Sequence, residues 1–192
     1  MTDSSVNHNA SHGLLVQNQN SGGVEAPVDH SVIADNAGSG VYVADYQRGD
    51  LTVNISDSTI NDNENFGIYA INEFNNDTLT LNVTNSSIES NAYNGVDLYN
   101  GTGAYNTNTG NLVANIRDTD ITGNGQSGIY ASNTSTGSLT LNIQDTHITN
   151  NTDDGVTAIN FGAGGPFILN ITDSVITGNQ LNGLKIFMEA MR

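Results

Sequence analysis

Two adjacent carboxylates, Asp153 and Asp154, are the residues of this chain best suited by type to catalysis. They stand in the segment Asn151-Thr152-Asp153-Asp154-Gly155. Paired carboxylates can act as general acid and general base in the hydrolysis of a glycosidic bond. The competing interpretation is a solvated polar corner. Asn151 and Gly155 also belong to a repeated pattern, so repetition explains part of this segment without a catalytic role.

Other catalytic groups are few and dispersed along the chain. A lyase or epimerase that abstracts an acidic proton needs a base beside groups that neutralise the substrate. The cations are scattered over different repeats: Arg48, Arg117, Lys185 and Arg192. His8 and His12 could touch a metal, but no third ligand is evident in the sequence. With no cysteine present, thiolate sites and disulfides are excluded. We therefore expect no enzymatic activity, with Asp153 and Asp154 as the alternative.

Aromatic residues recur near one position of the repeat and predict a ligand-binding face. Flat rings stack on sugars or on a protein partner, while neighbouring amides donate hydrogen bonds. The competing interpretation is β-propensity with stacking between neighbouring strands. The candidate binding residues are Tyr42, Tyr69, Tyr99, Tyr105, Tyr130 and Phe74.

One phrase, Asp-Ser/Thr-x-Ile-x-x-Asn-x-x-x-Gly-Ile/Val, recurs along the whole chain and must position these side chains. Its asparagine column is Asn9, Asn36, Asn63, Asn91, Asn124, Asn151 and Asn179. Its glycine column is Gly13, Gly40, Gly67, Gly95, Gly128, Gly155 and Gly183. Successive glycines lie 27, 27, 28, 33, 27 and 28 residues apart. A fixed period of this size indicates a solenoid whose repeats bury their apolar faces against each other.

Hydrophobicity alternates with a period of two inside each repeat, which indicates strands. In 51–56, for example, Leu, Val and Ile alternate with Thr, Asn and Ser. Short strands are also expected around Ile60 and at 67–71. We therefore predict an all-β, right-handed parallel β-helix of about seven coils of ~27 residues, with three short strands per coil. Residues 1–192 form a single segment, and 99–111 is an insertion loop that accounts for the 33-residue interval.

The invariant columns have structural explanations. Asparagines stacked once per coil can form an amide ladder along the axis or occupy a left-handed corner. The glycine column supplies either positive φ or room for a tight bend. A recurring aspartate is expected to form a turn through hydrogen bonds to its own backbone. This aspartate column consists of Asp3, Asp57, Asp118, Asp145 and Asp173.

Composition limits the partners. The chain has 192 residues and a formal net charge of -16, with 4 Lys plus Arg against 20 Asp plus Glu. Clustered cations are needed to bind phosphates, so nucleic acid is excluded as a partner. No apolar run reaches the roughly 18 residues of a membrane span, so we expect no direct membrane insertion of this segment. No cofactor is expected, although corner Asp and Asn oxygens could bind calcium.

The repeat resembles those of pectate-lyase-like proteins and of Gram-negative autotransporter passenger domains. Segments such as Leu79-Thr80-Leu81-Asn82-Val83-Thr84 look most like the passenger domains. The segment 151–153 resembles the Asn-Thr-Asp element of polygalacturonase-type glycosidases. The partner motifs of that family do not match: His12-Gly13 lies far upstream, in the wrong order, and no Arg-x-Lys element follows. The passenger resemblance implies a fragment of a longer bacterial protein that is anchored at the outer membrane or secreted.

This resemblance implies a non-catalytic adhesin that binds host glycan or protein, or its own copies. The alternatives are a polysaccharide-active enzyme fragment and an inert structural spacer. Self-association would use the polar lattice of Thr52, Asn54, Thr80, Asn82, Thr140 and Asn142.

Overall fold

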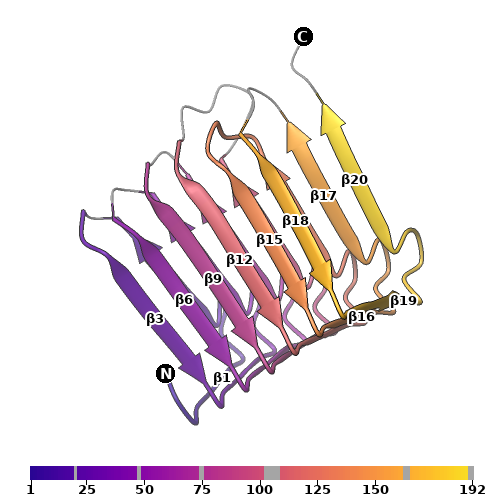
Figure 1. The fold of residues 1–192 in the computed structure, drawn as a ribbon. Helices are drawn as coiled ribbons and strands as arrows, with labels where there is room; N and C mark the ends of the chain where they lie inside the picture. The colour runs from indigo at the N-terminus through magenta and orange to yellow at the C-terminus, as the bar shows by residue number, and fades with distance from the viewer. Residues whose placement is uncertain (20, 47–48, 74–75, 102–108, 162–164, 190–192) are drawn as a thin grey trace.

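The computed structural model describes residues 1–192 except 20, 47–48, 74–75, 102–108, 162–164 and 190–192. Across the described residues, the regular secondary structure comprises twenty strands and no helix. Strands of successive coils pair in parallel to form three sheets (Figure 1). The chain is a parallel β-solenoid of about 6 turns with about 28-residue spacing, which confirms the predicted fold class.

The first sheet contains the shortest strands, and each places one aliphatic side chain in the core. Its strands are β1 (Ser5–Asn7), β4 (Val32–Ala34), β7 (Thr59–Asn61), β10 (Ser87–Glu89), β13 (Asp120–Thr122), β16 (His147–Thr149) and β19 (Val175–Thr177). The central residues are in register, as in the pairings of Ile33 with Ile60 and of Ile60 with Ile88. This column is the isoleucine position of the repeated phrase.

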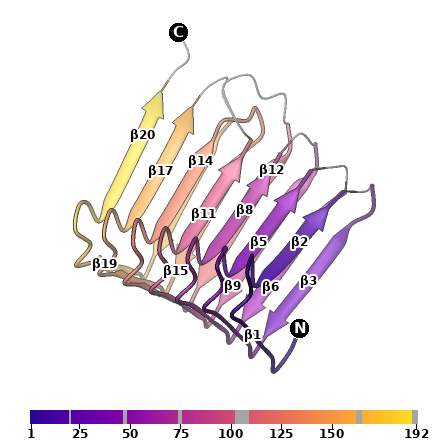
Figure 2. The same cartoon turned by 180° about the vertical axis from the view of Figure 1, so that it is seen from behind.

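The second sheet begins directly after each glycine of the repeat. Its strands are β2 (Leu14–Asn18), β5 (Val41–Asp45), β8 (Ile68–Asn72), β11 (Val96–Asn100), β14 (Ile129–Asn133), β17 (Val156–Phe161) and β20 (Leu184–Glu189). Figure 2 shows these strands side by side along the solenoid.

The third sheet contains the alternating runs of the sequence. Its strands are β3 (Val24–Asp29), β6 (Leu51–Ser56), β9 (Thr78–Thr84), β12 (Asn111–Arg117), β15 (Leu139–Gln144) and β18 (Phe167–Thr172). In β6, Leu51, Val53 and Ile55 are buried, whereas the intervening polar residues are partly exposed. Each buried aliphatic side chain contributes on the order of 1.5–3 kcal/mol.

The predicted insertion loop 99–111 is shorter in the structure. Tyr99 and Asn100 end β11, and Asn111 begins β12. Both ends of the expected loop therefore continue the parallel pairing with the neighbouring coils, because their backbone groups gain ladder hydrogen bonds there.

The asparagine column forms a buried amide ladder. Asn91 is 1% exposed, and its Nδ2 donates to Asn124 Oδ1 at 3.0 Å and to the Ile60 carbonyl at 3.2 Å. Its Oδ1 accepts from Nδ2 and from the backbone N–H of Asn63, at 2.9 and 3.2 Å. Both amide hydrogens and both lone pairs of the oxygen are thus used, as a buried amide requires.

The glycine column is explained by close packing between coils. A Cβ on Gly67 would lie 2.6 Å from the Gly95 carbonyl oxygen and 2.6 Å from Ile88 Cγ2. The alternative based on positive φ is wrong for this column, because left-handed residues lie elsewhere in the coil. They occur at the aspartate column, as at Asp57 (φ 49), and two residues after the isoleucine, as at Asp62 (φ 53). A short polar side chain tolerates this conformation.

A second asparagine column closes the corner after five of the seven strands of the second sheet. It consists of Asn18, Asn72, Asn100, Asn133 and Asn160, five residues after the repeated glycine, and is called the clamp column here. Asn72 Nδ2 donates to the Asn111 carbonyl at 2.8 Å and to the Asp77 carbonyl at 3.5 Å. Four clamp residues therefore tie the end of their strand to the far side of the following loop: Asn72, Asn100, Asn133 and Asn160. Asn18 Nδ2 donates instead to the Gly49 carbonyl of the next coil.

Candidate functional site

A continuous stripe of stacked rings runs along the outer face of the second sheet. It is called the aromatic stripe and consists of His12, Tyr42, Tyr69, Tyr99 and Tyr130. The centroids of neighbouring rings are 4.6, 5.0, 5.7 and 5.7 Å apart in that order. These separations lie in the range in which aromatic pairs attract each other.

Tyr99 joins the stripe from a different strand position. Tyr42, Tyr69, Asp97 and Tyr130 occupy equivalent positions of successive strands, so Asp97 interrupts the tyrosines. Tyr99 lies two residues after Asp97 on the same side of β11, and its ring packs against both Tyr69 and Tyr130. The stripe therefore continues past the aspartate.

The rings of the stripe are half-buried; Tyr42 and Tyr69 stack, and the other neighbouring rings are tilted against one another. Burial is the main cause that raises the pKa of Tyr69, to about 12, with the Asp97 carboxylate adding to it. Burial also raises the pKa of Tyr42 above its ordinary value, as does its hydroxyl contact with Tyr46 at 3.2 Å. The tyrosine hydroxyls are therefore neutral hydrogen-bonding groups at physiological pH.

A groove of about 500 Å³ opens beside the stripe. Phe66, Tyr93, Tyr99 and Tyr130 form aromatic parts of its wall. Phe66 stacks between Tyr69 and Tyr93, with ring centroids 5.3 and 5.6 Å away. The polar lining includes Asp97, Asp153, Asp154 and Lys185. Aromatic side chains combined with groups that form hydrogen bonds can hold a small molecule in a groove of this size.

Asp97 is a buried carboxylate in the wall of this groove. The residue is 1% exposed, and its Oδ2 accepts a hydrogen bond from Asn94 Nδ2 at 3.2 Å. Its Oδ1 has no hydrogen-bond partner among the described residues. Burial raises the pKa of Asp97 to about 7, and the bond from Asn94 opposes this rise only in part. Asp97 is therefore partly protonated near neutral pH.

Asp154 is buried in the same groove but in a different environment. Its Oδ1 accepts from the Nδ2 and the backbone N–H of Asn182, at 2.7 and 3.0 Å. Its Oδ2 accepts from Thr157 Oγ1 at 2.8 Å, with Lys185 Nζ at 3.6 Å. Burial raises the pKa of Asp154, but these hydrogen bonds and the Lys185 charge outweigh it, so the pKa lies below its ordinary value.

The two adjacent carboxylates that the sequence singled out line the same groove but lie in different environments. Asp154 is buried in its hydrogen-bond network, whereas Asp153 is half-exposed in the preceding corner. The Asp153 backbone N–H donates to the Gln126 carbonyl at 3.2 Å, as a corner residue would. The buried carboxylate that shares the groove with Asp154 is instead Asp97, which lies on a different coil.

Sequence reasoning did not identify Asp97 as a functional residue. The sequence signal that could have identified it is its position: Asp97 occupies the strand position that holds tyrosine in the neighbouring coils. Two other candidates, Phe74 and Tyr105, lie outside the described residues.

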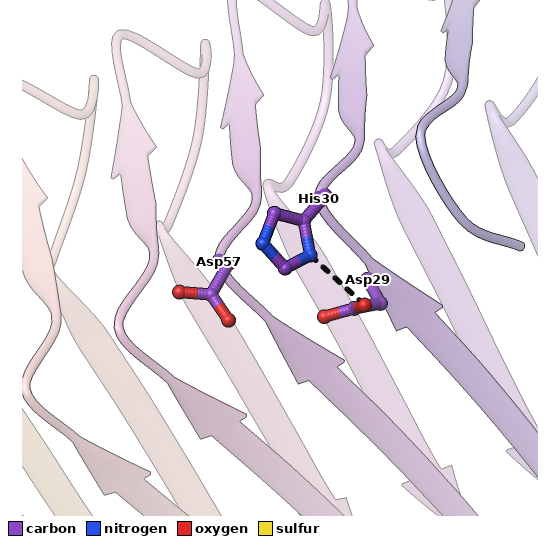
Figure 3. A group of neighbouring side chains, drawn as sticks. All are labelled: Asp29, His30 and Asp57. Atoms are coloured by element: carbon purple, nitrogen blue, oxygen red, sulfur yellow. Dashed lines mark ion pairs between the residues drawn. The ribbon is translucent and has the colours of Figure 1, made fainter.

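A second cluster of polar groups lies at a corner between the third and first sheets. Figure 3 shows the His30 ring between the carboxylates of Asp29 and Asp57. One potential ligand atom from each of the three lies within 4.8 Å of the others. His30 Nδ1 is 2.9 Å from Asp29 Oδ2, and Ser56 Oγ donates to Asp29 Oδ1 at 2.6 Å.

Hydrogen bonding explains this cluster without a metal. The Asp29 bond is the main cause that raises the pKa of His30, and bonds from Ser56 and then His30 lower the pKa of Asp29. Calcium prefers six to eight oxygen ligands, so a set containing one imidazole does not fit it. Calcium binding elsewhere on the acidic corners stays a prediction.

The outer face of the third sheet has its own amide ladder. It runs through Asn54, Asn82, Asn115, Asn142 and Asn170, with Nδ2-to-Oδ1 distances of 2.7 to 2.8 Å. Each bond of this ladder uses one amide hydrogen of the donor, which leaves the second hydrogen for water or a partner. Asn54, Asn82 and Asn142 of this ladder belong to the lattice for which self-association is predicted.

No family model, curated protein or solved structure matches the chain. The described part of the chain contains no helix long and apolar enough to cross a membrane.

Proposed function

We propose that this chain is a non-catalytic glycan-binding segment of a bacterial surface or secreted protein. The observation that carries the proposal is the aromatic stripe, a row of half-exposed rings that crosses successive coils. The coils repeat at the ~4.8 Å spacing of parallel strands, so a chain of sugar rings can follow the stripe. The adjoining groove adds hydrogen-bonding groups that orient a ligand.

The charge of the chain supports binding of a neutral or cationic glycan over binding of a polyanion. The formal net charge is -16. Lys185 is the cationic side chain that lines the groove, and it lies beside Asp154. Phosphate backbones and uronate polymers would meet repulsion there, because they require clustered cations. A neutral or cationic sugar meets no such penalty.

A polysaccharide-active enzyme is the second candidate, favoured by the contrast between Asp97 and Asp154. Two carboxylates in one groove whose pKa values are pushed apart form the pattern of a general acid and a general base. Asp154, however, uses its oxygens in three hydrogen bonds and a contact with Lys185. Three of its roughly four lone-pair sites are occupied, and the hydrogen bonds and the Lys185 charge lower its pKa, so it is a poor base for activating water, which supports the non-catalytic proposal.

A glycan array on four proteins tests the binding face. Tyr69→Leu with Tyr99→Leu removes two rings, and Tyr69→Phe with Tyr99→Phe keeps the rings while removing the hydroxyls. Phe161→Leu is the control, because its ring contacts Phe187 rather than the stripe.

We expect the wild type, the Phe pair and the control to bind the same sugars, and the Leu pair to lose them. Equal signals for the wild type and the Leu pair would refute the proposal. Sugar release that disappears in Asp97→Asn or Asp154→Asn would favour the enzyme instead. If sedimentation depends on protein concentration and the array gives no signal, self-association is favoured. If the protein stays monomeric and the array gives no signal, an inert spacer is favoured.

A further inference from the structure

Asp97 is the buried acidic group of the groove whose hydrogen-bonding capacity the described residues leave incomplete. It is 1% exposed, and only its Oδ2 has a partner, the amide of Asn94. A buried carboxylate oxygen without a partner is costly, since it has lost water and gained nothing in return. Such a group in the wall of a groove favours a ligand that carries a positive charge.

The elements around Asp97 supply no positive charge to it. Tyr69 on β8, Tyr99 on its own strand and Tyr130 on β14 face it with neutral rings, and all three have raised pKa values. Asp153 and Asp154 line the same groove from the corner before β17. Lys185 on β20 lies 3.6 Å from Asp154, and its charge acts on that carboxylate.

We propose that the groove binds the ammonium group of an amino sugar, with Asp97 as counter-ion and the faces of Tyr99 and Tyr130 as its aromatic wall. The inference rests on the proposed glycan-binding function and names the class of sugar. A cation over a tyrosine face is attracted by the ring, and the attraction is larger where water is excluded. The ammonium charge also stabilises the ionised form of Asp97, whose Oδ1 has no hydrogen-bond partner among the described residues.

Charge and size favour an amino sugar over other ligands. Three carboxylates and one ammonium line the groove, so a uronate carboxylate would be repelled. The volume of about 500 Å³ lies within the range of small-molecule sites and extends into the stripe, where further sugar rings can stack. A neutral N-acetyl sugar would stack equally well but would leave Asp97 without a cation.

Titration calorimetry with four tetramers near neutral pH tests the inference. The ligands are tetramers of glucosamine, N-acetylglucosamine, galacturonic acid and lysine. The proteins are the wild type, Asp97→Asn and the control Asp62→Asn. Asp62 is an exposed corner carboxylate outside the groove, and Asn150 occupies the equivalent corner of another coil with similar φ.

We expect the wild type and Asp62→Asn to bind the glucosamine tetramer about tenfold more tightly than its acetylated form. Asp97→Asn should bind both alike, and the galacturonic acid tetramer should bind weakest.

Equal affinity of the wild type for the amino and acetyl forms would overturn the inference and leave the glycan-binding proposal intact. This comparison needs no variant, so a folding defect cannot obscure it. If the wild type binds none of the three sugar tetramers, the proposed glycan-binding function is refuted instead. Tighter binding of tetralysine than of the glucosamine tetramer would overturn the assignment to a sugar.

Discussion

Replacing Asp97 with asparagine should change how the stability of this protein depends on pH. The folded pKa of Asp97 is about 7, against 3.8 for the ordinary group. Between these two values the folded state holds a proton that the unfolded state has released. Folding stability therefore falls as pH rises through this window and levels off above the folded pKa.

The size of the effect follows from the pKa difference. About three pKa units correspond to about 4 kcal/mol over the whole window. Roughly 2.5 kcal/mol of this falls between about pH 5 and about pH 8, because part of the change occurs below that range. The asparagine amide is neutral at every pH, can accept the Asn94 bond and is nearly the same size.

Urea unfolding of wild type, Asp97→Asn and Asp62→Asn at both pH values measures this term. Other groups titrate in the same range, but they are common to all three proteins and cancel in the comparison. We expect Asp97→Asn to gain roughly 2.5 kcal/mol relative to wild type between the two pH values. Asp62→Asn should follow the wild type. Parallel profiles for wild type and Asp97→Asn would show that the carboxylate is ionised without cost, which would refute the reasoning.

Three further predictions concern the framework and the corner cluster. Asn91→Ala should lower the free energy of unfolding by about 3 kcal/mol or more, because it leaves several buried partners unsatisfied. Asn82→Ala, on the exposed ladder, should cost about 1 kcal/mol or less in the same urea titration. Gly67→Ala should destabilise by about 3 kcal/mol or more, because its Cβ would meet backbone of the next coil, whereas Gly22→Ala meets nothing within 4 Å and should be near neutral. An equal effect of the two alanines on the melting temperature would contradict the close-packing explanation. His30 should titrate by NMR with a pKa above its ordinary value of 6.5. Asp29→Asn should lower this pKa, because the hydrogen bond to Asp29 is the main cause of its rise. An unchanged His30 titration curve in that variant would exclude the contact.

The fold followed from the sequence because identical columns must coincide in a solenoid. Once Ile60 and Ile88 are equivalent, parallel pairing places one over the other, and the alternation in 51–56 decides which side chains are buried. The glycine column was harder to interpret, since positive φ and close approach both favour glycine. Only the distance to the next coil separates them.

The candidate site was less accessible from the sequence. Strand register gives the positions of Tyr69 and Asp97, but it does not reveal that the Tyr99 ring fills the gap in the stripe. The Asp97 environment depends on Asn94 and on rings from neighbouring coils, which are far apart in the chain. The clamp column was visible in principle, because asparagine recurs five residues after the glycine.

The clamp column gives this solenoid a single place where its length can vary. From Leu51 to Gly67, and likewise from Leu79 to Gly95 and from Leu112 to Gly128, the spacing is sixteen residues. The differences between coils therefore fall in the segment after the clamp. Asn72 reaches a carbonyl five residues on, and Asn100 reaches one ten residues on. A foreign peptide grafted between those two anchor points would leave every stacked column in register, so this corner is where an engineer could add a new recognition loop.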